Sequence, residues 1–141
     1  MKQHFISTFI LLIALSVAIA APLKRSTKFE KCTRFNNVPN LLNVKITPDP
    51  LIPNQPFTVS TSGTVNTAVT AGNVEVSVDG LSAEYSDFDD ADFEAEANTT
   101  FKVKKQPLNP LPNNITFAVS VVATDDDGNT IGCANKTFAF K

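Results

Sequence analysis

Carboxylates are the groups in this sequence with the most evident capacity for chemistry. Seven of the 13 residues in the segment Glu84–Glu96 are acidic, and Phe88 and Phe93 interrupt the run as candidate aromatic anchors. Two carboxylates held about 5 to 10 Å apart can hydrolyse a glycosidic bond, and clustered carboxylates can bind calcium. Both activities need a geometry that adjacency in the sequence does not supply. We therefore interpret the run as a solvated charged edge, in an edge strand or an ordered loop, that blocks pairing between molecules.

A second acidic cluster, Asp125–Asn129, has the composition of a calcium loop. It lacks the length and the closing glutamate of an EF-hand. Asp, Gly and Asn are also the residues that form tight turns between strands. We therefore predict a hairpin turn at Asp126–Asn129.

The N-terminus has the pattern of a secretory signal peptide. A positively charged start, an apolar run over Phe5–Ala20 and a small-x-small cleavage pattern at the end of that run together form this signal. An uncleaved membrane anchor is the alternative, although a span needs about 20 apolar residues and this run is shorter. We assign residues 1–20 to the signal peptide and residues 21–31 to an N-terminal segment, in which Lys24-Arg25 offers a dibasic processing site.

The expected mature chain has no histidine, because His4 is the only one and leaves with the signal peptide. A His general base, a Ser-His pair and a His-ligated metal are therefore excluded. Loss of Lys2 leaves 11 basic and 14 acidic residues, a net charge of −3, with no basic cluster longer than Lys104-Lys105. Phosphate backbones attract concentrated Lys and Arg. We expect no enzyme, no cofactor, no metal and no nucleic-acid partner.

The two cysteines and three glycosylation sequons fit an oxidising, secretory route. Cys32 and Cys133 lie at opposite ends of the expected domain, so a single disulfide is the simplest expectation, with two free thiols as the alternative. Asn98, Asn114 and Asn135 begin Asn-x-Thr sequons, which carry glycans only where the side chain meets water. We expect a secreted, extracellular protein, with an endolysosomal or vacuolar lumen as the alternative.

Short runs of alternating apolar and polar residues follow Cys32. The runs are Leu42–Ile46, Phe57–Gly63, Val74–Gly80, Phe101–Lys104, Ile115–Ala123, Thr130–Cys133 and Thr137–Phe140. Turns are predicted at Pro48–Pro53, Ala71–Asn73 and Pro107–Pro112. This spacing predicts one all-β domain over residues 32–141: an immunoglobulin-like β-sandwich of two antiparallel sheets with about seven strands. The absence of tryptophan argues against an antibody-type domain.

Three longer segments together resemble a known family. They are Leu42-x-Val44-x-Ile46-Thr47-Pro48-Asp49-Pro50, then Pro53-x-x-Pro56-Phe57-Thr58-Val59-Ser60-x-Ser62-Gly63-Thr64, and Val119-x-Val121-x-Ala123-Thr124-Asp125-Asp126-Asp127-Gly128-Asn129-x-Ile131-x-Cys133. This pattern resembles ML-domain proteins, the lipid-recognition family that includes fungal phosphatidylglycerol/phosphatidylinositol transfer proteins and the Niemann-Pick type C lysosomal sterol carrier. The resemblance extends from Cys32 to Phe140.

The resemblance implies two sheets that part at one edge and leave an apolar cavity for a sterol or phospholipid, used for lipid transfer or lipid sensing. It also implies that Cys32 and Cys133 pair, and that the protein is a monomer which touches membranes transiently. The residues expected to line the cavity are Phe57, Val59, Val76, Val78, Leu81, Tyr85, Phe101, Val103, Phe117, Val119, Val121 and Phe138. Alternation alone shows only that these residues face inward, because every sandwich needs such a core.

The chain departs from the family pattern in its middle. Relatives have two further disulfides, including an Asp-Leu-Cys segment and a Cys-Pro segment, whereas Asp87-Phe88-Asp89 and Gln106-Pro107 stand near those places here. The alternative function is therefore a ligandless secreted β-sandwich interaction module that uses its acidic edge as the contact.

Overall fold

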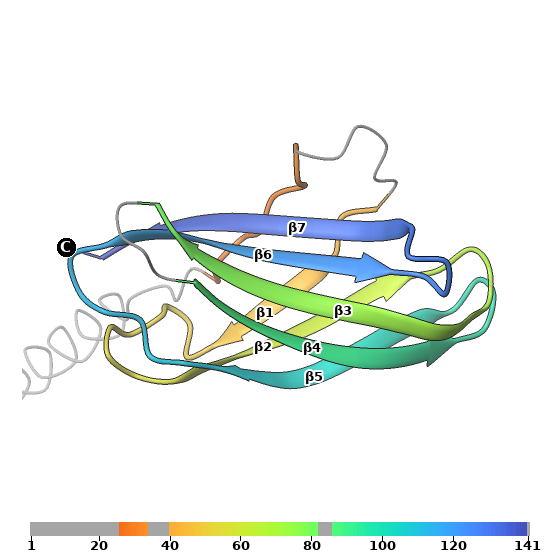
Figure 1. Ribbon diagram of the computed structural model, residues 1–141, viewed down its shortest axis with the longest axis horizontal. Coiled ribbons are helices and arrows are strands. Elements are labelled where there is room, and N and C mark those ends of the chain that lie inside the picture. The colour runs from red at the N-terminus through yellow and green to blue at the C-terminus, as the bar shows by residue number, and fades with distance from the viewer. Residues whose placement is uncertain (1–25, 34–39, 82–85, 141) are drawn as a thin grey trace, which may run out of the picture.

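The computed structural model describes residues 26–33, 40–81 and 86–140. They form two antiparallel sheets that pack face to face (Figure 1). The strands are β1 (Asn43–Thr47), β2 (Phe57–Thr64), β3 (Val69–Gly80), β4 (Ser86–Ala95), β5 (Thr100–Leu108), β6 (Thr116–Thr124) and β7 (Thr130–Ala139). One sheet has the order β1-β2-β5 and the other β4-β3-β6-β7. Among the described residues, no helix is long and apolar enough to cross a membrane.

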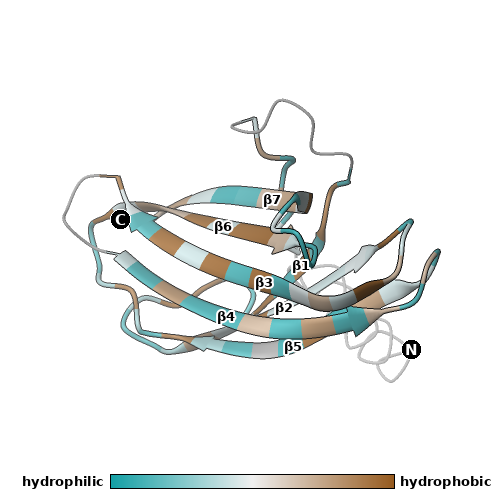
Figure 2. Ribbon diagram, turned by 45° about the vertical axis from the view of Figure 1, so that its right-hand side comes forward, coloured by the Kyte–Doolittle hydropathy of each residue, from teal (hydrophilic) through white to brown (hydrophobic). Residues whose placement is uncertain are grey.

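Alternation along each strand produces the two layers, because successive side chains of a strand point to opposite faces. Figure 2 shows the resulting alternation of hydrophobic and hydrophilic residues along the strands. In β6, for example, Phe117, Val119 and Val121 are fully buried while the residues between them are half-exposed. The inward residues of both sheets form one hydrophobic cluster. The predicted fold class, an all-β sandwich of two antiparallel sheets, is confirmed.

The predicted turn at Ala71–Asn73 is wrong, since β3 runs without a break from Val69 to Gly80. The pairing of β3 with β4 shifts its register between Val69 and Gly72, so the glycine marks an irregularity inside a strand. A Cβ atom on Gly72 would lie 2.5 Å from the ring of Phe93. Glycine is therefore required there by close packing and not by chain reversal.

Two further predicted boundaries differ from the structure. Strand β5 continues through Pro107, which was expected to begin a turn. Because β5 is an edge strand of its sheet, a residue without an N–H is tolerated there. The two closing runs, Thr130–Cys133 and Thr137–Phe140, are joined in the single strand β7, which ends at Ala139. The acidic run forms β4, an edge strand, which resolves the choice between strand and loop.

The hairpin turn predicted at Asp126–Asn129 joins β6 to β7. The amide of Gly128 donates to the carbonyl of Asp125 at 3.0 Å, and Gly128 has a positive φ of 78°. The amide of Asp125 in turn donates to the carbonyl of Asn129 at 3.0 Å. This backbone conformation favours glycine.

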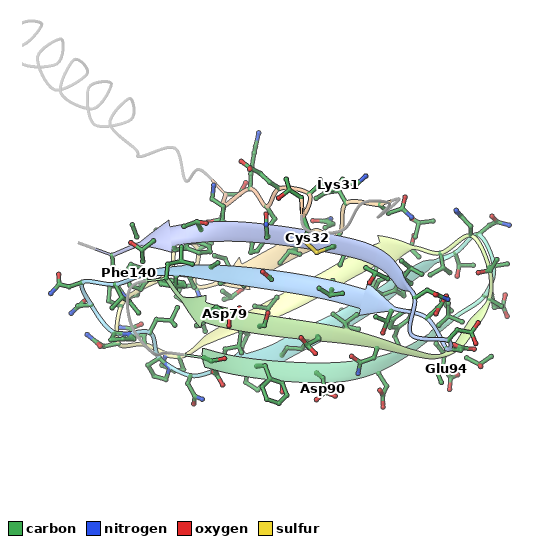
Figure 3. The ribbon with its side chains drawn as sticks, turned by 45° about the horizontal axis from the view of Figure 1, so that its top comes forward. Lys31, Cys32, Asp79, Asp90, Glu94 and Phe140 are labelled. Carbon is green, nitrogen blue, oxygen red and sulfur yellow. A yellow bond between two sulfur atoms is a disulfide. The ribbon has the colours of Figure 1, made fainter. Side chains whose placement is uncertain are left out.

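Residues 26–33, which are called the N-terminal segment from here on, are fastened to the outer edge of β7 (Figure 3). Cys32 forms the predicted disulfide with Cys133, and no described cysteine is free. Glu30 and Asn135 exchange two backbone hydrogen bonds of 2.8 Å. Residues that precede Cys32 therefore pack on the sandwich as part of the same fold.

Candidate functional site

The interior between the sheets collects most of the residues that were expected to line a cavity. From β2 and β5 come Phe57, Val59, Phe101 and Val103, and from β3 and β6 come Val76, Val78, Phe117, Val119 and Val121. All nine side chains are at most 7% exposed and belong to one cluster. Both sheets thus present a mainly apolar face to each other.

Two of the expected lining residues are placed differently, and a third is not among the described residues. Leu81 is 61% exposed just beyond the end of β3, so it is not part of the interior. Phe138 is half-buried on β7 and stacks on Phe117, with ring centroids 5.4 Å apart. Tyr85 lies outside the described residues, as do the expected signal peptide and Lys24-Arg25.

Strand β1 and the residue before it contribute inward residues that were absent from the expected lining. Leu42, Val44 and Ile46 are at most 7% exposed, and they belong to the same cluster. Their alternation was visible in the sequence and predicted a strand. Their place along one edge of the interior depends on the strand order β1-β2-β5, which alternation does not reveal.

The two phenylalanines of the acidic run have opposite environments. Phe93 is 7% exposed and stacks on Phe101 with ring centroids 4.1 Å apart, so it anchors β4 to the core. Phe88 is 69% exposed. The two residues are five positions apart in one strand, so they point to opposite faces. The expectation that both act as anchors is wrong for Phe88.

One edge of the sandwich, between β4 and β5, is closed by hydrogen bonds. The side chain of Gln106 is 2% exposed, and its Nε2 donates to the carbonyls of Val74 at 3.1 Å and Asp89 at 3.4 Å. The amide of Asn109 donates to Oδ2 of Asp87 at 2.9 Å. These contacts join the two segments, Asp87–Asp89 and Gln106-Pro107, that stand where the family pattern has cysteines.

The opposite edge, between β1 and β7, is joined at one end. There the amide of Cys133 donates to the carbonyl of Asn40 at 3.2 Å. Leu42 packs so tightly against Gly132 that a Cβ atom at that glycine would clash with the leucine. Toward the other end of the edge, the backbone amide and Oγ1 of Thr27 donate to the Asp49 carboxylate at 2.8 and 2.6 Å. The N-terminal segment therefore crosses this edge and is held to the loop that follows β1.

Two open grooves flank the N-terminal segment at this edge. The larger, of about 910 Å³, has an apolar lining that includes Leu51, Phe138 and Phe140, and its charged lining residues are Lys28 and Lys136. The smaller, of about 580 Å³, lies along β1. Phe140 lies at the end of the sandwich where β7 finishes (Figure 3). Volumes of this size fall in the range of ligand pockets, about 300 to 1,000 Å³.

Two buried polar atoms, Oγ1 of Thr61 and Oε1 of Gln106, have no hydrogen-bond partner within the described part of the chain. Both side chains are 2% exposed, and they belong to the paired strands β2 and β5. Because the two carbonyl acceptors require the amide nitrogen of Gln106 to face them, Oε1 points away and is the atom without a hydrogen bond. An unpaired buried acceptor costs about 1 to 3 kcal/mol. The interior of the three-stranded sheet is therefore not wholly apolar.

The carboxylates of the β6–β7 turn are engaged by local donors. Asp126 accepts hydrogen bonds from Oγ1 of Thr70 at 2.6 Å and from the amide of Ala71 at 2.8 Å, and these bonds lower the pKa of its carboxyl. The amide and side chain of Asn129 donate to Asp125 and likewise lower the pKa of that carboxyl. Both carboxylates therefore fix the turn and its contact with β3.

The three sequon asparagines differ in accessibility. Asn98 and Asn114 are exposed in connections between strands and have positive φ values of 58° and 60°. Asn135 is half-buried on β7, where its backbone pairs with Glu30. Thr137 is exposed on the same face of β7, as alternation predicts.

Comparison of the sequence with models of known protein families agrees with the resemblance described above. Residues 26–140 match the ML-domain family model, which is most of the chain. The chain belongs to the ML-domain family. The match begins at the N-terminal segment that crosses the β1–β7 edge. No curated protein matches the sequence.

A solved structure agrees on the fold. The chain is similar to chicken MD-1, whose structure was determined in complex with lipid IVa, with a TM-score of 0.51 and 10% sequence identity over 77% of this chain and 85% of MD-1. At that identity the likeness shows the fold alone. A weaker likeness, with a TM-score of 0.47 and 12% identity, covers 70% of this chain and 13% of a Bacteroides uniformis β-glucuronidase.

Proposed function

We propose that this protein is a secreted lipid-binding protein that holds a sterol or phospholipid between its two sheets, for transfer between membranes or for lipid sensing. The observation that carries the proposal is the membership of the ML-domain family, together with a continuous apolar interior built from both sheets. Apolar surface covered by a ligand contributes about 25 cal/mol per Å² removed from water.

The unequal edges of the sandwich support the β1–β7 edge as the lipid entrance. Gln106 on β5 and Asn109 just after it donate hydrogen bonds to β3 and β4, so the other edge is closed by hydrogen bonds. At the β1–β7 edge the groove beside Phe138 and Phe140 opens to solvent. An apolar chain that enters there would extend along the inward faces of β6 and β7. The grooves and the interior are thus parts of one proposed site.

We infer that the protein is not an enzyme and works as a monomer outside the cell or in an endolysosomal or vacuolar lumen. The disulfide and the ML-domain membership support an extracellular or lumenal location. The exposure of Asn98 and Asn114 supports glycans at those two sequons more strongly than at Asn135. The proposed cavity residues remain those named from the sequence that face inward, extended by Leu42, Val44 and Ile46.

The alternative is a ligandless interaction module. It is favoured by the tight packing of the interior, where Val59, Val76 and Phe117 are 0% exposed. In that case the sheets do not part, and the exposed acidic strand β4 is the contact surface.

A matched pair of variants tests the entrance. Phe140→Asp places a charge in the larger groove, and Phe88→Asp places the same charge on the exposed face of β4. Burying an unpaired charge costs several kcal/mol. We therefore expect Phe140→Asp to weaken binding of a fluorescent sterol or phospholipid by at least about tenfold, while Phe88→Asp binds as the wild type. If both variants bound the fluorescent lipid as tightly as the wild type does, the proposal that lipid enters at the β1–β7 edge would be wrong.

A further inference from the structure

The outer face of the three-stranded sheet carries a cluster of lysines, which we call the basic face: Lys45 on β1 and Lys102 and Lys104 on β5. All three side chains are exposed. Asn43 pairs with Ser62, which pairs in turn with Lys102, so one row of outward residues crosses all three strands. Since neighbouring strands lie about 4.8 Å apart, the lysines of β1 and β5 are separated by about 10 Å. The basic face therefore spreads its charge across the width of a sheet.

The basic face has the chemistry of an anion-binding surface. Its lysines surround a shallow hollow of about 320 Å³. The outward polar side chains in that hollow belong to Asn43, Ser60 and Ser62. Strands β1, β2 and β5 contain no Asp or Glu. Within the described residues, none of the three lysine side chains makes a hydrogen bond or an ion pair. Their charges are thus available to a partner.

The opposite side of the molecule carries the opposite charge. Strands β3 and β4 contain seven acidic residues and no Lys or Arg, and five of the seven are exposed on the outer face: Glu75, Asp79, Asp90, Asp92 and Glu94. Asp79, Asp90 and Glu94 lie along these two strands (Figure 3). The outer faces of two packed sheets point away from each other. The charge of this acidic protein is therefore polarised, and a negatively charged surface attracts one face and repels the other.

An exposed apolar residue and the proposed lipid entrance border the basic face. Leu41 is 53% exposed and lies beside Asn43 and Ser62 in a neighbouring hollow. Leu41 and Lys45 also line the 580 Å³ groove along β1. Lysine charge, an exposed leucine and the groove at the sheet edge thus form one continuous surface.

We propose that the basic face docks the protein on an anionic phospholipid bilayer. A bilayer fits better than a soluble anion because the lysines are spread over a flat sheet and because Leu41 offers an apolar group beside them. Each lysine near an anionic membrane surface contributes about 1 kcal/mol, and this attraction falls within a Debye length of about 8 Å. The acidic strands then face the solvent, and the β1 groove lies at the membrane. The role of docking in lipid delivery rests on the proposed function, whereas the docking itself does not.

Vesicle flotation at low and physiological salt tests the docking. The probes are phosphatidylcholine vesicles with and without phosphatidylserine, and the proteins are the wild type, K45Q, K102Q/K104Q and the control K31Q. Lys31 is exposed on the N-terminal segment, away from the basic face (Figure 3). We expect binding only with phosphatidylserine, weakened roughly fivefold by K45Q and roughly 30-fold by K102Q/K104Q. K31Q should bind as the wild type, and all variants should keep the wild-type melting temperature.

Several outcomes would overturn the docking proposal. If K102Q/K104Q bound vesicles as tightly as the wild type does, the basic face would not be the surface that contacts the membrane. If the wild-type protein bound a sulfated polysaccharide column but no vesicles, the partner of the basic face would be a soluble polyanion and not a bilayer. Lipid extracted from the same purified protein is the separate readout of the proposed function. If the vesicle binding depends on the lysines but the extract contains no lipid, the docking proposal stands and the proposed lipid carriage is rejected. If the extract contains lipid but the vesicle binding does not depend on the lysines, lipid carriage stands and the docking proposal is rejected.

Discussion

The disulfide gives a prediction whose magnitude follows from the structure. Cys32 and Cys133 are 101 residues apart in the sequence, so their bond closes most of the chain into one loop. In the chain-entropy model, a loop of about 100 residues contributes about 4.7 kcal/mol by restricting the unfolded state. Replacing both cysteines by alanine should lower the free energy of unfolding by an amount of this order. Residual structure in the unfolded chain can reduce it.

The same substitution should have a local effect on the proposed entrance. Without the disulfide, the N-terminal segment is held by the Glu30–Asn135 backbone pair and by Thr27 on Asp49. These few bonds contribute about 0.5 to 1.5 kcal/mol each. We therefore expect the segment to exchange its amide hydrogens faster than the sheets do.

Urea denaturation and native-state hydrogen exchange measure the two effects. The control variant is Thr27→Ala, which removes the hydrogen bond from Oγ1 to Asp49, keeps the one from the backbone amide and leaves the disulfide intact. It should lower the free energy of unfolding by about 1 to 3 kcal/mol. If the double cysteine variant lost less stability than Thr27→Ala, loop closure would not be the source of the stabilisation. Equal protection of the Glu30 amide and the β6 amides would refute the idea that the segment opens independently.

Three further predictions concern the core, the edge and the turn. Phe117→Ala removes a fully buried ring that contacts Phe138 and Phe140, and it should cost about 3 to 5 kcal/mol in a denaturant titration, against less than about 0.5 kcal/mol for Phe88→Ala at the surface. Gly132→Ala forces Leu42 to move and should cost about 1 to 3 kcal/mol, and a melting temperature unchanged from the wild type would show that the β1–β7 junction is looser than the structure indicates. The lowered pKa of Asp126 means that the native state binds its proton less readily than the unfolded state, so its stabilisation is present above the unfolded pKa of about 3.9 and is lost as the pH falls through the lower folded pKa. Asp126→Asn should therefore flatten the acid limb of melting temperature against pH, and an unaltered acid limb would contradict the assignment.

Much of the fold follows from local pattern because the inward face of each strand is set by a period of two. Val119, Val121 and Phe117 were placed correctly for this reason. Predictions based on alternation were wrong where a strand contains an irregularity. The irregularity at Gly72 was mistaken for a turn because glycine serves both purposes, and only the Phe93 ring above it distinguishes them.

The site was less predictable than the fold because it depends on how distant segments meet. Nothing in the local sequence of residues 26–33 indicates that they cross the β1–β7 edge and shape two grooves. The uneven distribution of charge between the two sheets could not be predicted from the sequence for a similar reason. Lys45 is more than 50 residues from Lys102 in the sequence, and the strand order β1-β2-β5 brings both to one face.

Mass spectrometry of an organic extract tests lipid binding most directly. The sample is the protein secreted by eukaryotic cells, purified without detergent and analysed again after incubation with lipid vesicles and repurification. We predict a sterol or phospholipid in a fixed ratio to the protein, and its loss in Phe140→Asp but not in Phe88→Asp. An extract free of lipid both before and after the incubation would contradict the account and leave the ligandless interaction module as the function.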